Sequence, residues 1–329
     1  MSLLDSVLED PWIKGLTLGL VVINVTMVIG GWSIWFERKF AGRMQNRPGP
    51  TEVGIFGLLQ PIADVLKLMQ KEEIVPKNAD APLFKMAPPI GVLLVLAGLA
   101  VVPLAPGVVA ADLDIGILFT MSIASLMVIP VWMAGWASNN KYALLGGMRA
   151  AAQAISFEVP LLLAALVPVI LAGSLRGGDI VAAQEGYRWF ALWPPGPGFV
   201  AFGLFFVASL AEANRIPFDI PEAESELVGG ITTEYVGMNF GLFYLAEYLH
   251  TFISSVVGVV LFWGGGEGPG PDGPHWLMLK SLVLFTSIFW IRWTLLRYRS
   301  DQFMNFCWRV LIPLGLGLVM VAALWVGLS

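Results

Sequence analysis

The chain has 329 residues, of which 57% are hydrophobic and only 13% are charged, and its mean hydropathy is +0.76. A soluble fold has no way to bury that much apolar surface, so the composition indicates an integral membrane protein. The net charge of -5 argues against a nucleic-acid partner, and the single cysteine, Cys307, excludes a disulfide-stabilised secreted domain.

Apolar segments recur along the whole chain, and a helix that crosses the hydrocarbon core takes roughly 20 such residues. Eight segments qualify in chain order: Gly15 to Phe36, Met86 to Pro106, Ile115 to Ala137, Ala150 to Gly173, Phe199 to Ala213, Val236 to Trp263, Trp276 to Ile291 and Asn305 to Leu328. The sequence therefore predicts an all-α, polytopic fold with about eight transmembrane helices, organised as a single integral membrane domain over residues 1–329.

Basic residues give this bundle an orientation. Of the 19 Lys and Arg residues, all but Lys14, Arg176, Arg188 and Lys280 fall on one side of the predicted spans. Because connections rich in Lys and Arg stay inside the cell, that side is predicted to be cytoplasmic and both termini to face outward. The cytoplasmic connections are then at about residues 37–85, 138–149, 212–235 and 292–304.

The first cytoplasmic connection contains an amphipathic pattern. Its polar residues fall at i, i+4, i+7 and i+11, namely Gln60, Asp64, Lys67 and Lys71, and the opposite face is apolar from Leu58 to Met69. This spacing predicts a helix from about Val53 to Gln70 that lies flat in the cytoplasmic membrane interface.

Two glutamates fall inside predicted spans, where ionisable groups are costly and usually functional. Glu158 follows a run of small residues in the fourth span. Glu247 lies near the middle of the sixth span, in a polar stripe with Tyr244, His250 and Thr251. We expect both carboxyl groups to face a hydrated seam; the alternative is that each is a protonated core residue with a structural role only.

The connection after the fifth span is unusually acidic for a cytoplasmic one. From residue 212 to 234 it holds six acidic residues and a single base, Arg215. Carboxyl groups this close titrate as a coupled set, with some pKa values raised toward neutrality, and a proton relay needs that property. The alternative is a solvated acidic loop that docks a basic partner.

The chain offers few ligands for a redox centre. Besides Cys307 it has only two histidines, His250 and His275. A structural zinc site or an iron–sulfur cluster takes about four Cys or Cys/His ligands. We therefore expect no metal site and no redox centre in this chain.

Four cytoplasmic segments resemble a known family. They are ERKFAGRMQNRPGP at 37–50, GLLQPIAD at 57–64, GWASNNKYALLG at 135–146 and AESEL at 223–227. They are similar, in the same order, to the H subunit of bacterial NADH-quinone oxidoreductase, the respiratory complex I. The chain departs from the family pattern at Ala137, Ala213, Leu296 and Ser300.

The resemblance implies a multi-pass subunit of a proton-translocating enzyme of the bacterial inner membrane, without a redox centre of its own. Quinone, either ubiquinone or menaquinone, would be the substrate at a shared site, and FMN and iron–sulfur clusters would belong to partner subunits. The implied partners are the hydrophilic quinone-site subunits and the small and antiporter-like membrane subunits, together with the lipid bilayer.

The resemblance also implies roles for individual residues. The quinone passage would be formed by Glu37, Arg38, Asp64, Phe243, Arg292 and Arg297. The acidic path that relays the effect of quinone reduction would be formed by Glu158, Glu212, Asp219, Glu222, Glu224, Glu226, Glu234 and Glu247. No residue of this chain would be catalytic in the sense of exchanging electrons with the quinone.

Three alternatives stay open at the level of sequence. The first is the equivalent subunit of a membrane-bound energy-converting hydrogenase, which handles no quinone. The second is a stand-alone proton-coupled transporter that uses Glu158 and Glu247. The third is a passive membrane anchor, which would tolerate the neutralisation of any buried glutamate.

Overall fold

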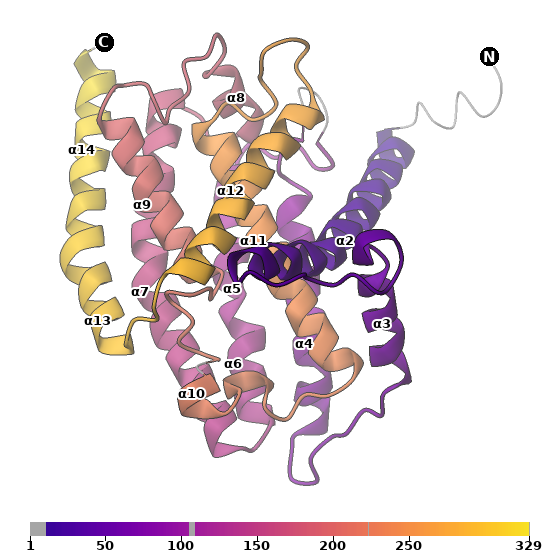
Figure 1. Ribbon diagram of the computed structural model, residues 1–329. Helices are drawn as coiled ribbons and strands as arrows, with labels where there is room; N and C mark the ends of the chain where they lie inside the picture. Colours follow the sequence, from indigo (N-terminus) through magenta and orange to yellow (C-terminus); the bar gives the residue numbers. More distant parts are fainter. Residues whose placement is uncertain (1–10, 105–108, 223, 329) are drawn as a thin grey trace, which may run out of the picture.

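The computed structural model describes residues 11–104, 109–222 and 224–328, which form helices and connections without a strand (Figure 1). The helices of the bundle are α2 (Pro11–Met44), α4 (Ala81–Leu99), α5 (Gly116–Leu126), α6 (Val128–Ala137), α7 (Lys141–Ala172), α9 (Pro197–Glu212), α11 (Met238–Phe262), α12 (Pro274–Thr294), α13 (Ser300–Phe306) and α14 (Ile312–Leu328). Short elements connect them: η1 (Ile55–Gly57), α3 (Gln60–Gln70), α8 (Gly177–Ala182), α10 (Glu224–Leu227), η2 (Gly230–Thr232) and the π-helical turn η3 (Cys307–Leu311).

The all-α, polytopic membrane fold is confirmed. Within the described residues, seven helices are long and apolar enough to cross a membrane, counting α5 with α6 and α13 with α14 as one each. The predicted fifth span corresponds to α9, which is apolar but has only 16 residues. In Figure 1 the start of α2 and the end of α14 lie toward the same end of the bundle, as an even number of crossings requires.

Helix α11 is the centre of the bundle. Every residue from Tyr248 to Phe262 is buried, and the helix contacts α2, α4, α9 and α12. A helix that is apolar all round is stable only when other helices surround it, which α11 achieves here. Its polar side chains are therefore forced to face other elements of the protein rather than lipid.

Several helices extend beyond the apolar segments that predict them. Helix α7 begins at Lys141, nine residues before the predicted span, where the Asn140 side chain accepts a hydrogen bond from the N–H of Tyr142 at 2.9 Å. Helix α2 continues to Met44. Hydropathy detects only the part of a helix that lies in hydrocarbon. The helical residues beyond that part therefore fall in the predicted connections 37–85 and 138–149.

The amphipathic helix α3 is shorter than predicted. It begins at Gln60 rather than near Val53, with Pro61 in its first turn, where the missing N–H has no helical partner to lose. The segment before it is broken at Phe56, whose φ is +55°. In Figure 1, α3 runs along the side of the bundle, more nearly parallel to α4 than across it, and it packs against α2 and α11.

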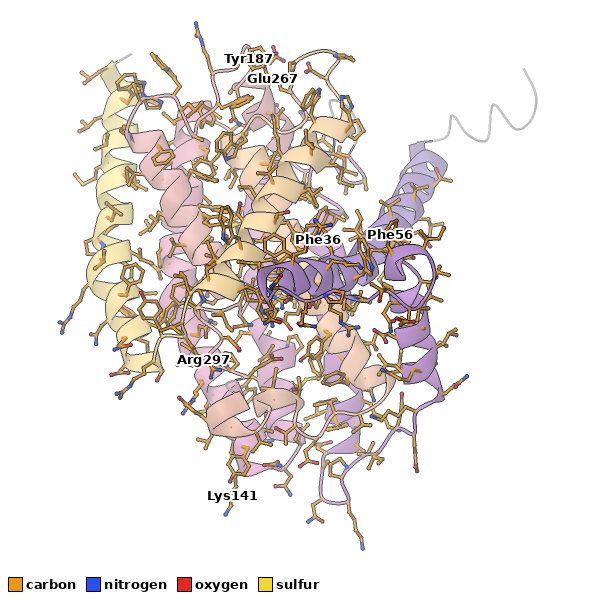
Figure 2. All side chains as sticks on the ribbon, viewed as in Figure 1. Phe36, Phe56, Lys141, Tyr187, Glu267 and Arg297 are labelled. Atoms are coloured by element: carbon orange, nitrogen blue, oxygen red, sulfur yellow. The ribbon has the colours of Figure 1, made fainter. Side chains whose placement is uncertain are left out.

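One end of the bundle is held by side chains that bind main-chain atoms. Buried Gln184 accepts hydrogen bonds from the N–H groups of Phe190 and Gly264 and donates to the carbonyl of Val260. Lys280 donates to the carbonyls of Trp263, Gly265 and Glu267. The Glu267 carboxylate accepts from the N–H groups of Gly186 and Tyr187 and from the Trp189 indole. Figure 2 shows this end, marked by Tyr187 and Glu267, opposite the end marked by Lys141.

Candidate functional site

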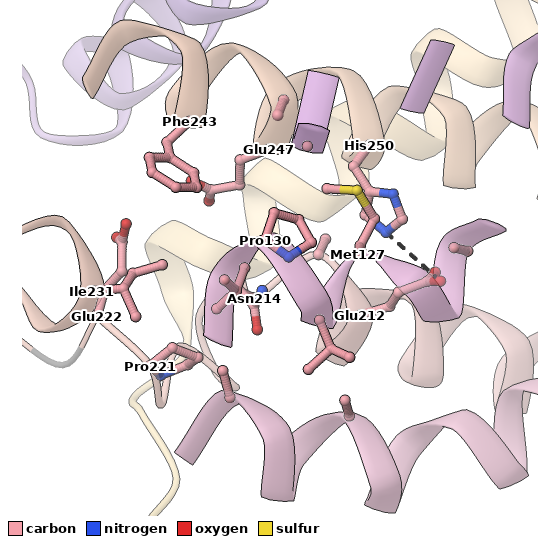
Figure 3. A pocket seen from close by; sticks show the side chains of 18 of the residues that line it. Met127, Pro130, Glu212, Asn214, Pro221, Glu222, Ile231, Phe243, Glu247 and His250 are labelled. Atoms are coloured by element: carbon pink, nitrogen blue, oxygen red, sulfur yellow. Dashed lines mark ion pairs between the residues drawn. The ribbon is translucent and has the colours of Figure 1, made fainter. Parts of the chain in front are cut away.

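A cavity lies between α6, α7, α9, α11 and the acidic connection. Its walls are mostly apolar, yet four carboxyl groups and an imidazole reach it: Glu158, Glu212, Glu222, Glu247 and His250. Figure 3 shows Glu247 and His250 on one helix, Glu212 opposite and Glu222 at the far side. We call this space the acidic cavity. The structure therefore brings together four carboxyl groups that the sequence separates by up to 89 positions.

Arg215 is the counter-charge of this region. It lies three residues after the end of α9, and only 1% of its surface is exposed. Its Nε atom is 3.2 Å from Oε1 of Glu247, and its Nη1 atom is 3.8 Å from Oε2 of Glu37. The guanidinium also lies over the Tyr248 ring, 4.3 Å from the centroid. One buried cation thus bridges two carboxylates from two different helices.

Glu37 is bound by two further side chains. Arg292 of α12 is 2.7 Å from its Oε1 atom, and the Tyr248 hydroxyl donates a hydrogen bond to its Oε2 atom at 2.5 Å. Only 4% of Glu37 is exposed. We call Glu37, Arg215, Glu247, Tyr248 and Arg292 the ionic cluster. The cluster contains two carboxylates and two guanidinium groups. A change of charge close to the cluster therefore alters how strongly each guanidinium group is attracted to each carboxylate.

Two carboxyl groups of the acidic connection lie beside this cluster. Burial raises the pKa of Asp219, against the opposing effect of Arg297, Arg292 and Arg215, and its Oδ1 atom has no hydrogen-bond partner among the described residues. Burial also raises the pKa of Glu222 to about 8, and the nearby carboxylates of Glu247 and Asp219 add to the effect. Burial and the neighbouring carboxylates thus favour the protonated form of Glu222.

Other predicted site residues lie outside the acidic cavity. Arg38 and Asp64 form an ion pair of 2.7 Å that joins α2 to α3, and Gln60 donates to the same carboxylate at 3.0 Å. These hydrogen bonds, opposed by partial burial, lower the pKa of Asp64. Arg297 lines a separate surface pocket, and its Nε atom has no hydrogen-bond partner in the described structure. Phe243, by contrast, lines the acidic cavity itself.

The later acidic residues of the connection are also dispersed. Glu226 forms an exposed ion pair of 2.6 Å with Arg149, which lowers its pKa. Glu234 accepts a hydrogen bond of 2.5 Å from the Asn140 side chain. The side chain of Glu224 lies outside the described residues. The acidic connection thus divides into a buried part before residue 223 and a part bound to the start of α7.

Three residues of the site were given no role from the sequence. Arg215 and Tyr248 belong to the ionic cluster, and buried Gln153 donates to the carbonyls of Ala211 and Phe218 at 2.8 and 2.9 Å, which attaches the acidic connection to α7. Two signals were available: Arg215 is the single base among six acids, and Gln153 is a lone amide in an apolar helix. Within the described residues, no three His, Cys, Asp or Glu side chains converge as a metal site.

The chain matches known proteins over nearly its whole length. The profile of a family described as NADH dehydrogenase matches residues 16–323. The H subunit of the NADH-quinone oxidoreductase of Dehalococcoides mccartyi (strain CBDB1) is 45% identical over 316 residues, which cover 96% of this chain and 88% of that protein.

Two other relatives agree. The H subunit of the same enzyme from Methylococcus capsulatus is 46% identical over 313 residues, covering 94% of this chain and 97% of that protein. The H 2 subunit from Cereibacter sphaeroides (strain ATCC 17029 / ATH 2.4.9) is 44% identical over 310 residues, covering 94% and 96%. The chain therefore belongs to the NADH dehydrogenase family, as an H subunit of NADH-quinone oxidoreductase.

Proposed function

We propose that this chain forms part of the quinone-binding chamber of a proton-pumping NADH-quinone oxidoreductase and couples quinone reduction to proton translocation. The observation that carries the proposal is the bridge made by Arg215. On one side it faces Glu37, which belongs with Arg292 to the residues implied for the quinone passage. On the other side it faces Glu247, which lines the acidic cavity. Two sets of residues with different implied roles thus share one buried cation.

This shared cation suggests how the coupling works. Reduction of quinone to quinol takes up two electrons and two protons, so charge appears and is neutralised near the headgroup. A change of charge near Glu37 alters the attraction that holds Arg215 between Glu37 and Glu247. If Arg215 moves toward Glu37, Glu247 loses its counter-charge, and its protonation changes in response. In this proposal the electrons come from an iron–sulfur cluster in a partner subunit, and this chain supplies only charge and proton transfer.

The opening of the passage is proposed to lie between α2 and α3. The Trp35 indole of α2 donates to the carbonyl of Phe56 in η1 at 3.3 Å, and the ion pair of Arg38 with Asp64 joins α2 to α3. The apolar face of α3 is exposed, including Leu66 and Met69. An apolar surface next to the membrane suits the long tail of a quinone that enters from the bilayer.

The relay role of Glu247 is testable by Glu247→Gln, which keeps the shape of the side chain and removes its charge. We expect the assembled enzyme to oxidise NADH normally with a water-soluble acceptor, because that reaction does not use this chain. We expect quinone-dependent proton pumping to fall by roughly 100-fold, in line with removal of a proton-transfer group. Pumping is measured in inverted membrane vesicles as quenching of a pH-sensitive dye.

Glu185→Gln is the matched control, because Glu185 is an exposed carboxylate two residues from Tyr187 and belongs to neither predicted set of site residues. Full pumping by the Glu247→Gln enzyme would refute the proposed coupling and favour the passive anchor. Proton uptake by liposomes that contain the purified chain alone would instead favour the stand-alone transporter.

The pKa of Glu222 predicts a pH dependence. Its carboxyl is neutral below about pH 8 in the folded protein and ionises above that value, whereas in the unfolded chain it ionises near 4.5. Burial of Glu222 therefore lowers the free energy of unfolding progressively as the pH rises from about 4.5 to 8. Above pH 8, Glu222 adds a buried negative charge close to Glu247. We expect NADH-quinone activity to fall as pH rises through about 8, and Glu222→Gln to remove that inflection.

Activity at about pH 6 to 9.5, with a water-soluble acceptor as the reference at each pH, measures this effect on both sides of the inflection. An unchanged alkaline inflection in the Glu222→Gln enzyme would show that another group causes it.

A further inference from the structure

The acidic cavity contains a second titratable pair, in which Glu212 belongs to the predicted acidic path and His250 does not. His250 of α11 and Glu212 of α9 face each other, with Nε2 3.6 Å from Oε1. Figure 3 shows the imidazole directed at this carboxyl group. Both residues are buried, with 7% and 8% of their surface exposed, and the His250 Nε2 atom has no hydrogen-bond partner among the described residues. A histidine with a purely structural role normally has both ring nitrogens satisfied.

A second cavity begins behind this pair. It is a small space between α4, α5 and α11. His250 and Glu212 line both this space and the acidic cavity, so the pair forms part of the wall between them. Apart from this pair, the second cavity is apolar except at Thr120 and Ser254, and the Ser254 hydroxyl donates to Oε2 of Glu212 at 3.4 Å.

The ionisable groups around His250 favour proton exchange on the side of the acidic cavity only. Glu212 faces it from α9, Glu158 lines the same cavity from α7, Glu222 from the acidic connection, and Glu247 precedes it by three residues on α11. In the structure as described, helices α4 and α5 contribute no ionisable side chain to the lining of either cavity. Among the described residues, Glu212 and His250 are therefore the ionisable groups that reach the second cavity.

We propose that His250 transfers protons between the acidic cavity and the second cavity, with Glu212 as its exchange partner. The proposal rests on the proposed function. The step needs no electrons: the O–H bond of neutral Glu212 breaks, its proton bonds to the lone pair of Nε2, and a carboxylate faces an imidazolium. The imidazolium then releases a proton to a water molecule or hydroxyl group in the second cavity, and the neutral imidazole is restored. At 3.6 Å the two atoms are just beyond hydrogen-bond distance, so a side-chain rotation or one bridging water completes the path.

Chemical rescue of His250→Ala in the assembled complex tests this proposal. We expect proton pumping per NADH oxidised to fall by roughly tenfold, because one transfer step is lost. Added imidazole should restore most of the pumping, whereas pyrazole, which has the same shape but is a far weaker base, should not. The matched control is His275→Ala, which should pump normally. His275 is exposed and follows the loop that carries Glu267.

A second variant separates proton transfer from packing. His250→Asn keeps a polar side chain of similar volume without a group that titrates near neutral pH, and it should lose pumping to the same degree. Full pumping by His250→Asn, or equal rescue of His250→Ala by imidazole and pyrazole, would overturn the proposal. Pumping that is lost in Glu247→Gln but intact in both His250 variants would overturn this inference alone, whereas intact pumping in Glu247→Gln would overturn the proposed function.

Discussion

Replacing Arg215 with methionine is expected to prevent the subunit from accumulating in the assembled complex. Methionine has a similar length but no charge, so Glu37 loses one of its two cations and Glu247 loses the ion pair with Nε. Removing one partner of a buried ion pair costs about 3–5 kcal/mol, because the remaining charge stays desolvated. The lost contact with the Tyr248 ring adds about 1 kcal/mol. The sum is comparable with the whole stability of a typical domain.

The amount of subunit in the membrane and the size of the complex on native gels measure this effect. Arg299→Met is the matched control, because that guanidinium is 77% exposed and its ion pair with Asp301 contributes about 0–1 kcal/mol. If the Arg215→Met enzyme assembled and pumped normally, Arg292 alone would suffice as counter-charge, and the bridging role of Arg215 would be wrong.

Gly230→Ala is expected to disrupt the acidic connection almost as strongly. Gly230 has a φ of +55°, and a Cβ atom built there would lie 2.0 Å from the carbonyl oxygen of Pro221. The left-handed conformation costs a residue other than glycine about 1–2 kcal/mol, and the overlap with main-chain atoms adds about 1–3 kcal/mol. The segment that must move carries Glu222. We therefore expect both the assembly and the NADH-quinone activity of this variant to fall sharply.

Gly229→Ala provides a control from the adjacent residue. Its φ of -175° is extended backbone, and the nearest atom to a new Cβ would be the Thr233 hydroxyl at 3.4 Å. Activity and thermal stability of the purified complex should be nearly unchanged in this variant. Equal losses in the two variants would show that the connection tolerates no substitution at all, and the close approach of Pro221 to Gly230 would not explain the result.

The fold follows from the sequence to a large extent because hydrocarbon imposes a simple rule. Each crossing helix needs a long apolar segment, and seven helices of the described chain meet that criterion by length and composition alone. The boundaries were less predictable, because α7 extends to Lys141 through residues whose polarity looks like that of a loop. Such extensions are stabilised by capping and tertiary packing, as at Asn140, and neither contributes to hydropathy.

The residue types of the site could be predicted from the sequence, but the contacts between these residues could not. Glu158 and Glu247 stand out because a charge in an apolar segment is costly. The division of the acidic connection depends on contacts with α7 and α11 that no local pattern encodes. Glu222 and Glu226 are four residues apart, yet one faces the acidic cavity and the other pairs with Arg149 at the surface. The bridge from Glu37 to Glu247 likewise needs α2 and α11 to meet.

The end of the bundle near Tyr187 has a consequence for sequence variation among relatives. Gln184, Lys280 and Glu267 bind main-chain N–H and carbonyl groups, apart from the one bond to the Trp189 indole. Main-chain groups fix the path of the backbone rather than the identity of the residues that carry them. Here the path itself restricts the sequence, because a Cβ atom at Gly264, Gly265 or Gly266 would lie 2.8–2.9 Å from a neighbouring atom. We expect positions 264–266 to stay glycine in relatives that keep Gln184, Lys280 and Glu267.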